Sequence, residues 1–550
     1  MKIFNQKLIL TFIVLNLFSF VVILCNIMQP LISQKLLDLT LAGSYGELPV
    51  QFVLLSVAIV VLLVCELCRK MMAARYKKGI LDGLRSAVLK GMLSKKLENF
   101  QLLNNQKYIS LFNNDLREIT EAYYVQFTDI LFNFLSLAVY ATALFRLNTI
   151  MALIVIATNV LPILAPLVFR RKLQLKKETY LESLKEYNVR LGDVVNGFAV
   201  IRVHQMKPLI ENLLRKTSER STDREKDYEI LTGFSNMLVG LLSYANYFCI
   251  ILAGVYLMIR GELSAGGLLA TIQVSELLVG PTVSITYQMN VFNAIKTVKR
   301  KVFKTYGQGD ISEEVMGRPE PIEKIEIRNL NFHYNEVPAL QNINLCFEKG
   351  KKYLIYGQSG SGKSTLFKVL SKMNSTYTGE ILVDGKTLSE VGETDYFSRI
   401  GIVYQTPFVF NDTLLNNITI FRKRDKKNVE KIIDELDLGR IKADILMGKV
   451  FKDSENNISG GEKQKIALAR VLLEGKQFIF LDEASSSIDA RSSFKIESDL
   501  LSKSEITLIN IEHKVNPNTL PLYDEVICLE GGYVTEILRS DEEKHKLLKH

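Results

Sequence analysis

The stretch Gly357-Gln358-Ser359-Gly360-Ser361-Gly362-Lys363-Ser364-Thr365 decides the fold of the second half of the chain. It follows a short apolar run, Lys352–Ile355, and precedes a helix-forming run, Leu366–Leu370. This spacing and context match the phosphate-binding P-loop, GxxxxGK[ST]. Glycines let backbone N–H groups surround phosphates, and the start of the following helix adds positive potential. We therefore predict an α/β ATPase, in which Lys363 contacts the β- and γ-phosphates and Ser364 gives its hydroxyl to Mg²⁺.

A second acidic motif lies about 120 residues downstream, where the apolar run Phe478–Leu481 ends in Asp482 and Glu483. A buried strand that ends in two acids is typical of the strand that holds Mg²⁺ in P-loop ATPases. We expect Asp482 to hold the metal through water and Glu483 to polarise the attacking water. The alternative is a buried strand whose last carboxylates only cap the following turn.

The run Ile458-Ser459-Gly460-Gly461-Glu462 lies between these two motifs. It resembles the LSGGQ signature of ABC transporters, which few other P-loop proteins share. Ile458, Glu462 and Lys465 replace the usual Leu, Gln and Arg, and none of these changes removes a catalytic atom.

The other family markers follow in the expected order, and the resemblance implies their roles. Tyr334 would stack on adenine, Gln405 would be the Q-loop residue that contacts Mg²⁺ and ATP, and Asp489 would be the D-loop aspartate beside ATP. His513 matches the switch histidine, which would arrange the water together with Glu483. Asp453 aligns with the acid that contacts the coupling helices in this family, although its neighbours here differ from the usual glycines.

Composition predicts that the first half of the chain belongs to a different class of domain than the ATPase half. The chain has 550 residues and a formal net charge of +9, and its mean hydropathy is +0.13 despite 23% charged residues. Residues 1–310 hold 35 Lys and Arg against 22 Asp and Glu, a net charge of +13, and the remainder carries −4. The basic excess therefore lies in the apolar half, which indicates basic loops beside a membrane rather than a nucleic-acid-binding ATPase domain.

The apolar segments predict six membrane spans, since about 20 mostly apolar residues are needed to cross a bilayer. The expected spans are about 8–28, 50–68, 127–145, 150–169, 236–259 and 265–295. Between spans two and three, and again between spans four and five, long charged segments have helical periodicity, which predicts helices that continue into the cytoplasm. Lys and Arg are concentrated in these segments and at both flanks, so both termini and the ATPase domain are expected to be cytoplasmic, in the cell membrane.

Six spans followed by one such ATPase resemble a half-transporter of the type IV ABC exporter fold. The expected organisation is a transmembrane domain over 1–305, a linker over 306–321 and an ABC nucleotide-binding domain over 322–550. In this family the signature of one subunit covers the γ-phosphate bound to the P-loop of the other. The resemblance therefore implies a second half-transporter as partner, in a homodimer or a heterodimer, with ATP and Mg²⁺ as ligands.

The function expected from this resemblance is ATP-driven export of an amphipathic or hydrophobic substrate, such as a drug, lipid or peptide, by alternating access. The alternative is an importer of a metal chelate or similar solute on the same fold. Six basic-flanked spans argue against an ABC ATPase of translation or DNA repair, and Glu483 argues against a mere gated channel. Membrane lipids and a small amphipathic substrate are expected partners, and nucleic acid is not.

Glu276 is the candidate for substrate contact, because an ionisable side chain deep in a span is costly to bury. The alternative is a structural role, in which Glu276 packs between helices or lines a water-filled cavity.

Overall fold

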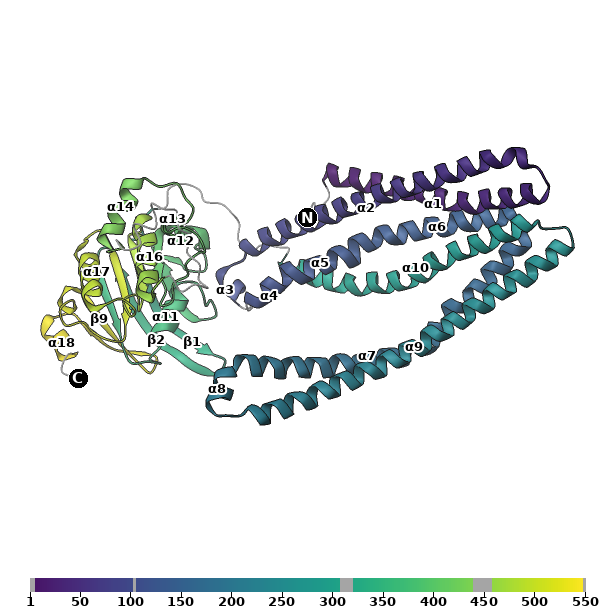
Figure 1. Ribbon diagram of the computed structural model, residues 1–550. Helices are drawn as coiled ribbons and strands as arrows, with labels where there is room; N and C mark the ends of the chain where they lie inside the picture. The colour runs from purple at the N-terminus through teal and green to yellow at the C-terminus, as the bar shows by residue number, and fades with distance from the viewer. Residues whose placement is uncertain (1–4, 102–104, 307–319, 439–457, 548–550) are drawn as a thin grey trace. The chain divides into compact units, whose positions relative to one another are not determined.

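The structure is a computed structural model, and it describes residues 5–101, 105–306, 320–438 and 458–547 (Figure 1). The chain forms two compact units. The first comprises Met1–Leu89 and Tyr108–Gly307, and the second comprises Lys90–Lys107 and Gln308–His550. Each unit is described by itself below.

The first unit is all-helical. Its elements are α1 (Gln6–Leu41), η1 (Tyr45–Glu47), α2 (Leu48–Leu93), α4 (Asn105–Ser110), η2 (Leu111–Asp115), α5 (Leu116–Ile119), η3 (Thr120–Val125), α6 (Gln126–Leu147), α7 (Thr149–Asn196), α8 (Phe198–Val203), α9 (Lys207–Ile259) and α10 (Ala265–Tyr306). The helices α7 and α9 lie side by side over much of their length, and α1, α6 and α10 pack against one another (Figure 1). Both η2 and η3 are π-helical turns, which interrupt an otherwise α-helical stretch.

Five helical segments among the described residues are long and apolar enough to cross a membrane. They are Gln6–Leu41, Tyr45–Leu93, Asn105–Leu147, Lys207–Ile259 and Ala265–Tyr306. The expected fourth span, 150–169, falls on α7, whose described apolar part, Thr149–Pro162, is shorter. A helical membrane domain is therefore present, and the count of six spans stays a prediction.

Local side-chain chemistry sets the turns at one end of the first unit. Asn148 separates α6 from α7, and its Oδ1 accepts hydrogen bonds from the backbone N–H groups of Ile150 and Met151 at 3.0 Å. This is the capping interaction that satisfies the first free donors of a helix. Asp38, near the end of α1, accepts from the Ser264 hydroxyl at 2.8 Å and from the Gly266 N–H at 2.9 Å. The end of α1 is thereby joined to the start of α10.

The second unit is an α/β domain with two sheets. Its strands are β1 (Lys324–Tyr334), β2 (Val337–Glu348), β3 (Lys352–Tyr356), β4 (Thr378–Val383), β5 (Lys386–Thr387), β6 (Ile400–Val403), β7 (Phe478–Asp482), β8 (Thr507–Glu512), β9 (Glu525–Glu530) and β10 (Tyr533–Leu538). Its helical elements are α3 (Leu97–Gln101), α11 (Lys363–Leu370), α12 (Glu393–Arg399), α13 (Leu414–Thr419), α14 (Lys426–Glu435), α16 (Gly460–Leu473), α17 (Ala490–Ser502), η5 (Leu520–Leu522) and α18 (Asp541–Lys546).

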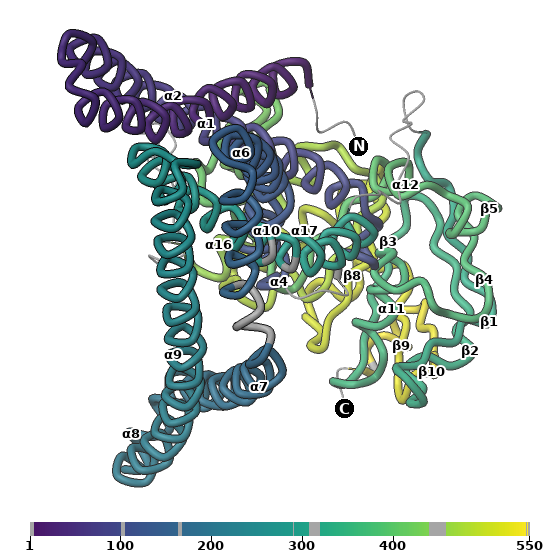
Figure 2. Tube along the Cα trace, turned by 90° about the vertical axis from the view of Figure 1, so that its right-hand side faces the viewer, coloured from purple at the N-terminus to yellow at the C-terminus, as the bar shows by residue number. Residues whose placement is uncertain are grey.

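The smaller sheet has the order β2-β1-β4-β5 and is antiparallel. Figure 2 shows its strands together at one side of the unit, apart from the helices α16 and α17. The larger sheet has the order β10-β9-β3-β8-β7-β6, and β9, β3, β8, β7 and β6 are parallel. Buried parallel strands read as continuous apolar runs, which explains why the sequence of β7 is almost entirely apolar.

The parallel order places the nucleotide motifs at one edge. β3, β7 and β8 are neighbours, and their carboxyl ends meet at the same side of the sheet. Ligands bind at this side in open α/β sheets. The P-loop follows β3, the acidic pair lies at the end of β7 and His513 follows β8, so three distant motifs converge.

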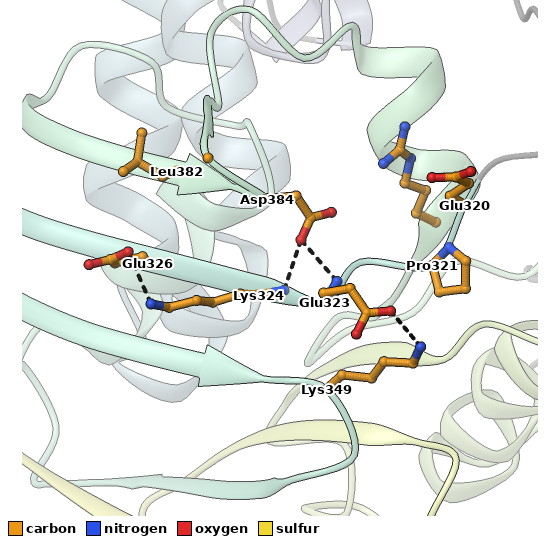
Figure 3. Close-up of a pocket in the computed structure, with 10 residues that line it drawn as sticks. Glu320, Pro321, Glu323, Lys324, Glu326, Lys349, Leu382 and Asp384 are labelled. Carbon is orange, nitrogen blue, oxygen red and sulfur yellow. Dashed lines mark hydrogen bonds and ion pairs between the residues drawn. The ribbon is translucent and has the colours of Figure 1, made fainter.

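The entry of the chain into the smaller sheet is fixed by Asp384 (Figure 3). Its Oδ1 accepts hydrogen bonds from the backbone N–H groups of Glu323 and Lys324, both at 2.9 Å. Beside it, Lys349 forms an ion pair with Glu323 at 2.6 Å. These residues border a cavity of about 620 Å³ with walls of mixed charge.

Residues 90–107 belong to the second unit through contacts of α3. The Leu97 N–H donates to the Glu393 carboxylate at 3.3 Å, and the Ser375 N–H donates to Glu98 at 3.2 Å. Burial raises the pKa of Glu393, and it lowers the pKa of nearby Lys372 to about 8. The helical segment that follows α2 is thus held to the ATPase fold by polar contacts.

Candidate nucleotide and catalytic site

The P-loop of the structure runs from the end of β3 into α11, the context that the sequence predicts. Gly362 has a φ of 103°, and a Cβ there would lie 2.7 Å from the Ala339 carbonyl oxygen. Only glycine suits both this left-handed backbone and this close approach. The loop is therefore shaped by its glycines, as expected for a phosphate cradle.

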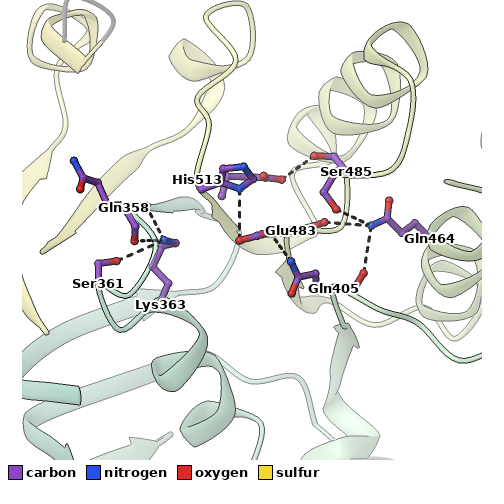
Figure 4. A network of polar contacts seen from close by, with 11 residues as sticks. Gln358, Ser361, Lys363, Gln405, Gln464, Glu483, Ser485 and His513 are labelled. Atoms are coloured by element: carbon purple, nitrogen blue, oxygen red, sulfur yellow. Dashed lines mark hydrogen bonds and ion pairs between the residues drawn. The ribbon is translucent and has the colours of Figure 1, made fainter. Parts of the chain in front are cut away.

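Lys363 lies 5% exposed inside this loop. Its Nζ donates to the carbonyl oxygens of Gly357 at 2.6 Å and Gln358 at 2.9 Å (Figure 4). Burial lowers its pKa, and the negative charges of Glu483 and Asp482 oppose that shift. The ammonium is held where the loop would place phosphates, so it can contact them without a large movement.

Glu483 occupies the turn directly after β7. Its φ is +47°, an uncommon conformation for a residue with a Cβ, and its N–H donates to the Ile511 carbonyl at 3.0 Å. Such backbone conformations concentrate at functional sites. The backbone bond to β8 continues the ladder by one residue and fixes where the carboxylate points.

Two of the predicted site residues, the metal- and ATP-site Gln405 and the catalytic His513, reach the Glu483 carboxylate (Figure 4). The Gln405 amide Nε2 donates to Oε2 at 2.7 Å, and Nδ1 of His513 lies 3.5 Å from Oε1. Gln405 comes from the segment after β6, and His513 from the segment after β8. The structure therefore brings together Glu483, Gln405 and His513, which are 78 and 30 residues apart in sequence.

Asp482 ends β7 and is the predicted metal residue. Burial, with the charge of neighbouring Glu483, raises its pKa to about 6, while Lys368 and Lys363 oppose the shift. Crowded acids of this kind gain from a bound cation, and carboxylate and hydroxyl oxygens are the ligands that Mg²⁺ prefers. The residues present therefore fit Mg²⁺ bound together with nucleotide, with Ser364 and Asp482 as oxygen donors. Gln405 uses Nε2 on Glu483, so its amide oxygen is the atom that could reach the metal.

A residue that sequence reasoning missed, Gln464, connects the signature helix to this centre. Its Nε2 donates to the carbonyl oxygens of Gln405 at 3.4 Å and Glu483 at 3.3 Å and to the Ser486 hydroxyl at 3.1 Å. Its Oε1 accepts from the Ser487 N–H at 3.1 Å. The side chain is 2% exposed. A buried amide with all of these partners positions the catalytic turn from α16.

Glu512 is a second residue that the sequence reading passed over. It ends β8, directly before His513, and accepts a hydrogen bond from the Ser485 hydroxyl at 2.8 Å. Burial raises its pKa to about 7, and the charges of Glu497, Glu483 and Asp482 add to the shift. The catalytic edge thus holds an extra buried carboxyl that titrates near neutral pH.

The signature turn begins α16, with Ser459 as its N-cap. The Glu462 N–H donates to the Ser459 hydroxyl at 3.3 Å, and the Ser459 N–H donates to the Glu462 carboxylate at 2.7 Å. This reciprocal pair is a capping box. Gly461 lies so close to the following turn that a Cβ would be 2.7 Å from the Ser487 carbonyl. The acid that replaces the usual Gln therefore has a structural role.

The remaining residues predicted to contact ATP include Tyr334 and Asp489, which lie outside the cluster around Glu483. Tyr334 ends β1, is 45% exposed and packs edge-on against Phe332, which leaves ring surface for an adenine. Asp489 caps α17, where its carboxylate accepts from the Ser492 N–H at 2.9 Å, and that backbone bond lowers its pKa. Its contact with ATP stays a prediction. Asp453 lies outside the described residues.

Glu276 lies on α10, and its side chain is exposed. Its buried neighbour Ser275 accepts a hydrogen bond from Asn159 at 3.3 Å, and the Asn159 amide oxygen accepts from Asn246 at 3.1 Å. A small polar network thus crosses α7, α9 and α10 beside Glu276. Its role in substrate contact stays a prediction.

Among the residues that the structure describes, no cluster of three or more His, Cys, Asp or Glu could hold a metal by itself. The cavity of Figure 3 is also separate from the nucleotide motifs, because the residues found in its walls include none of them. Fold and site together define a P-loop ATPase with a signature turn, joined to a helical membrane domain.

Comparisons with known proteins give the family. Residues 12–282 match the family model of the ABC transporter transmembrane region, and residues 340–486 match the ABC transporter family model. Putative multidrug export ATP-binding/permease proteins of Staphylococcus aureus strains bovine RF122 and Mu50 are 26% identical over 447 residues, which cover 79% of this chain and 76% of each relative. The chain belongs to the ABC transporters and is a half-transporter that hydrolyses ATP to drive transport.

A solved structure has the same architecture. It is described as a bacterial Atm1-family ABC exporter with ATP bound, and it is 20% identical with a TM-score of 0.78, over 99% of this chain and 96% of that one. At this identity the likeness concerns the fold, which is the type IV exporter fold. A half-transporter carries one P-loop and one signature, and it works as a dimer.

Proposed function

We propose that this chain exports an amphipathic or hydrophobic substrate from the cytoplasm, using ATP hydrolysis to drive alternating access. The observation that carries the proposal is the cluster at Glu483, whose carboxylate is contacted by Gln405 and lies 3.5 Å from His513. The relatives named as multidrug exporters and the exporter fold favour export over the import of a metal chelate.

Hydrolysis would use residues that already lie at the catalytic edge. Lys363 would bind the β- and γ-phosphates and stabilise the charge that develops during phosphoryl transfer. The Glu483 carboxylate would orient the attacking water and accept its proton, and His513 would hold the γ-phosphate and that water in line. Mg²⁺, when bound by Ser364, Gln405 and Asp482, would neutralise phosphate charge.

Each ATP would be enclosed by two chains. A P-loop bound to ATP leaves the γ-phosphate open to solvent, and the Ser459 turn of a second subunit would cover it. The start of a helix, here the start of α16, suits an anion because its backbone N–H groups and its dipole present positive potential. The partner would be a second copy or a related half-transporter, and this composite site would close when ATP binds.

Closure must then reach the membrane helices. The contacts of Leu97 with Glu393 and of Glu98 with Ser375 hold the segment after α2 to the ATPase fold. Movement of the ATPase unit would therefore pull on α2. Basic segments beside the spans favour an orientation with both termini and the ATPase domain in the cytoplasm.

The proposed class of substrate rests on Glu276. Glu276 is exposed beside the Asn159–Asn246–Ser275 network, and a carboxylate there would favour a cationic or zwitterionic amphiphile. Glu276→Ala should change substrate-stimulated ATPase more than basal ATPase. Equal loss of both would assign Glu276 to packing, with Glu262→Ala as the matched control on the same unit.

The hydrolytic role is tested with Glu483→Gln, which keeps the size of the side chain and its contact with Gln405. The purified variant should bind ATP and hydrolyse none, and unchanged hydrolysis would refute the role. The composite site is tested by mixing Lys363→Ala and Ser459→Arg chains. Each alone should fail to trap nucleotide, whereas the mixed dimer contains one site built from two intact parts. Trapping that stays absent in the mixture would contradict the composite site.

A further inference from the structure

An aromatic cavity of about 440 Å³ lies within the first unit, apart from the nucleotide site. Its walls come from α1, α2, η3, α6 and α10, and the residues that matter here are Phe12, Tyr76, Tyr123, Tyr124, Phe292 and Lys299. The Tyr123 and Phe292 rings are stacked at 4.7 Å, and Phe12 lies 5.7 Å from Tyr76. The cavity is therefore built from segments far apart in the sequence.

A single cation lies over these rings. Nζ of Lys299 is 3.5 Å from the centre of the Tyr123 ring and 4.7 Å from that of Tyr124. The nearby carboxylate of Glu121 is engaged elsewhere, with Lys77 at 2.6 Å and Arg117 at 3.2 Å. Within the described part of the chain no carboxylate pairs with Lys299, so its charge is balanced only by ring faces.

The backbone beneath these rings is also unusual. Tyr123 and Tyr124 lie in η3, a π-helical turn over Thr120–Val125. π-Helical turns are rare in proteins, and many of those that occur lie at functional sites. The irregular turn presents two neighbouring tyrosines to the same ammonium.

The position of the cavity suits the surface layer of a bilayer. It lies at the first turns of α1 and near the basic end of α10, where Lys296, Arg300, Lys301 and Lys304 are exposed. Aromatic and basic side chains gather at this level of membrane proteins. The mouth is apolar, since Ile9 and Phe127 line the cavity and are 47% and 48% exposed.

We propose that this cavity binds an anionic phospholipid of the leaflet at the basic ends of the helices, with the headgroup phosphate on Lys299 and an acyl chain over Ile9 and Phe127. A soluble anion would gain nothing from the apolar mouth. A zwitterionic lipid also has a phosphate, but its own ammonium group already compensates that charge, so it would gain less from Lys299 than an anionic lipid. Basic pockets between membrane helices are suited to anionic headgroups. The proposal requires only that these helices lie in a membrane and does not depend on the direction of transport.

The chain has no tryptophan, so one introduced residue is the sole tryptophan reporter. Phe292→Trp places it on the Tyr123 ring, Phe127→Trp places it at the mouth, and Phe52→Trp is the control, roughly 36 Å along α2 from Tyr76. Each full-length variant is put into nanodiscs of phosphatidylcholine with a fixed fraction of phosphatidylglycerol, and either lipid carries brominated acyl chains that quench tryptophan on contact.

At the cavity, brominated phosphatidylglycerol should quench about fivefold more than its bulk fraction predicts, the preference that about 1 kcal/mol for one basic side chain gives. The control reporter should show no preference. Lys299→Gln should abolish the preference, and Lys296→Gln, an exposed neighbour on the same helix, should retain it. Equal quenching by both lipids, or no quenching because a second copy covers the cavity, would overturn the proposal. Phe127→Trp provides the same readout if Phe292→Trp does not fold.

Discussion

Glu512 offers a prediction whose size can be worked from the structure. This carboxyl is 9% exposed, accepts one hydrogen bond from Ser485 and lies near Asp482 and Glu483. Glu512→Gln keeps the size of the side chain and the oxygen that accepts from Ser485, but it removes the titrating charge. The substitution should therefore stabilise the ATPase unit at alkaline pH.

The direction of the change in stability follows from the direction of the pKa shift of Glu512. The folded-state pKa of about 7 lies above the ordinary 4.5, so the folded state binds the proton more tightly than the unfolded state. The destabilisation from the charged form is absent below pH 4.5, grows as the pH rises, and is complete above pH 7. A shift of this size corresponds to about 3 kcal/mol in the free energy of unfolding. Glu512→Gln should gain up to that amount at pH 8 and less than about 1 kcal/mol at pH 5.

Hydrogen exchange of the β8 amides in the full chain is the assay, because protection of core strands reports the free energy of opening. Variant and wild type are compared at the same pH, so the intrinsic exchange rate cancels. Glu530→Gln, an exposed carboxyl at the end of β9, is the matched control and should change nothing. A gain that is equal at pH 5 and pH 8, or a loss at pH 8, would refute this reasoning.

Substitutions at three further positions test the site. Gly461→Ala would place a Cβ 2.7 Å from the Ser487 carbonyl and should reduce ATPase turnover about tenfold or more, measured by phosphate release; activity near wild type would show that the turn relaxes. Glu462→Ala removes the capping box and should cost the ATPase unit about 1 kcal/mol by hydrogen exchange, whereas Glu462→Gln should cost less; equal losses would exclude a capping effect. Tyr334→Ala should raise the KM for ATP with little change in kcat, and Tyr334→Phe should behave as wild type; a lower kcat alone would argue against adenine stacking.

The nucleotide motifs could be predicted because their chemistry is local. The P-loop needs glycines, a lysine and a hydroxyl within nine residues, and the strand before it and helix after it are visible as an apolar run and a helix-forming run. Convergence of Lys363, Glu483 and His513 then follows from parallel strands, whose carboxyl ends meet at one edge. The family markers supplied Gln405, which no local pattern would have found.

What could not be predicted depends on packing between distant segments. The contacts of Gln464 require the exact distance from α16 to the turn after β7, and the burial of Glu512 requires β8 to lie between β3 and β7. Ser459 and Glu462 have the spacing of a capping box, but the same residues also form part of the signature motif, so the spacing alone does not distinguish a cap from a changed signature. The aromatic cavity combines five elements and has no sequence motif.

The measurement that tests the account most directly is ATP-driven movement in proteoliposomes, with a cationic dye, a phospholipid analogue and a peptide as labelled probes. ATP added outside reaches only molecules whose ATPase domain faces outward. The account predicts that at least one probe accumulates in the lumen with wild type, and that none does with Glu483→Gln. Probe driven out of the lumen by external ATP, or accumulation that Glu483→Gln supports equally, would contradict it.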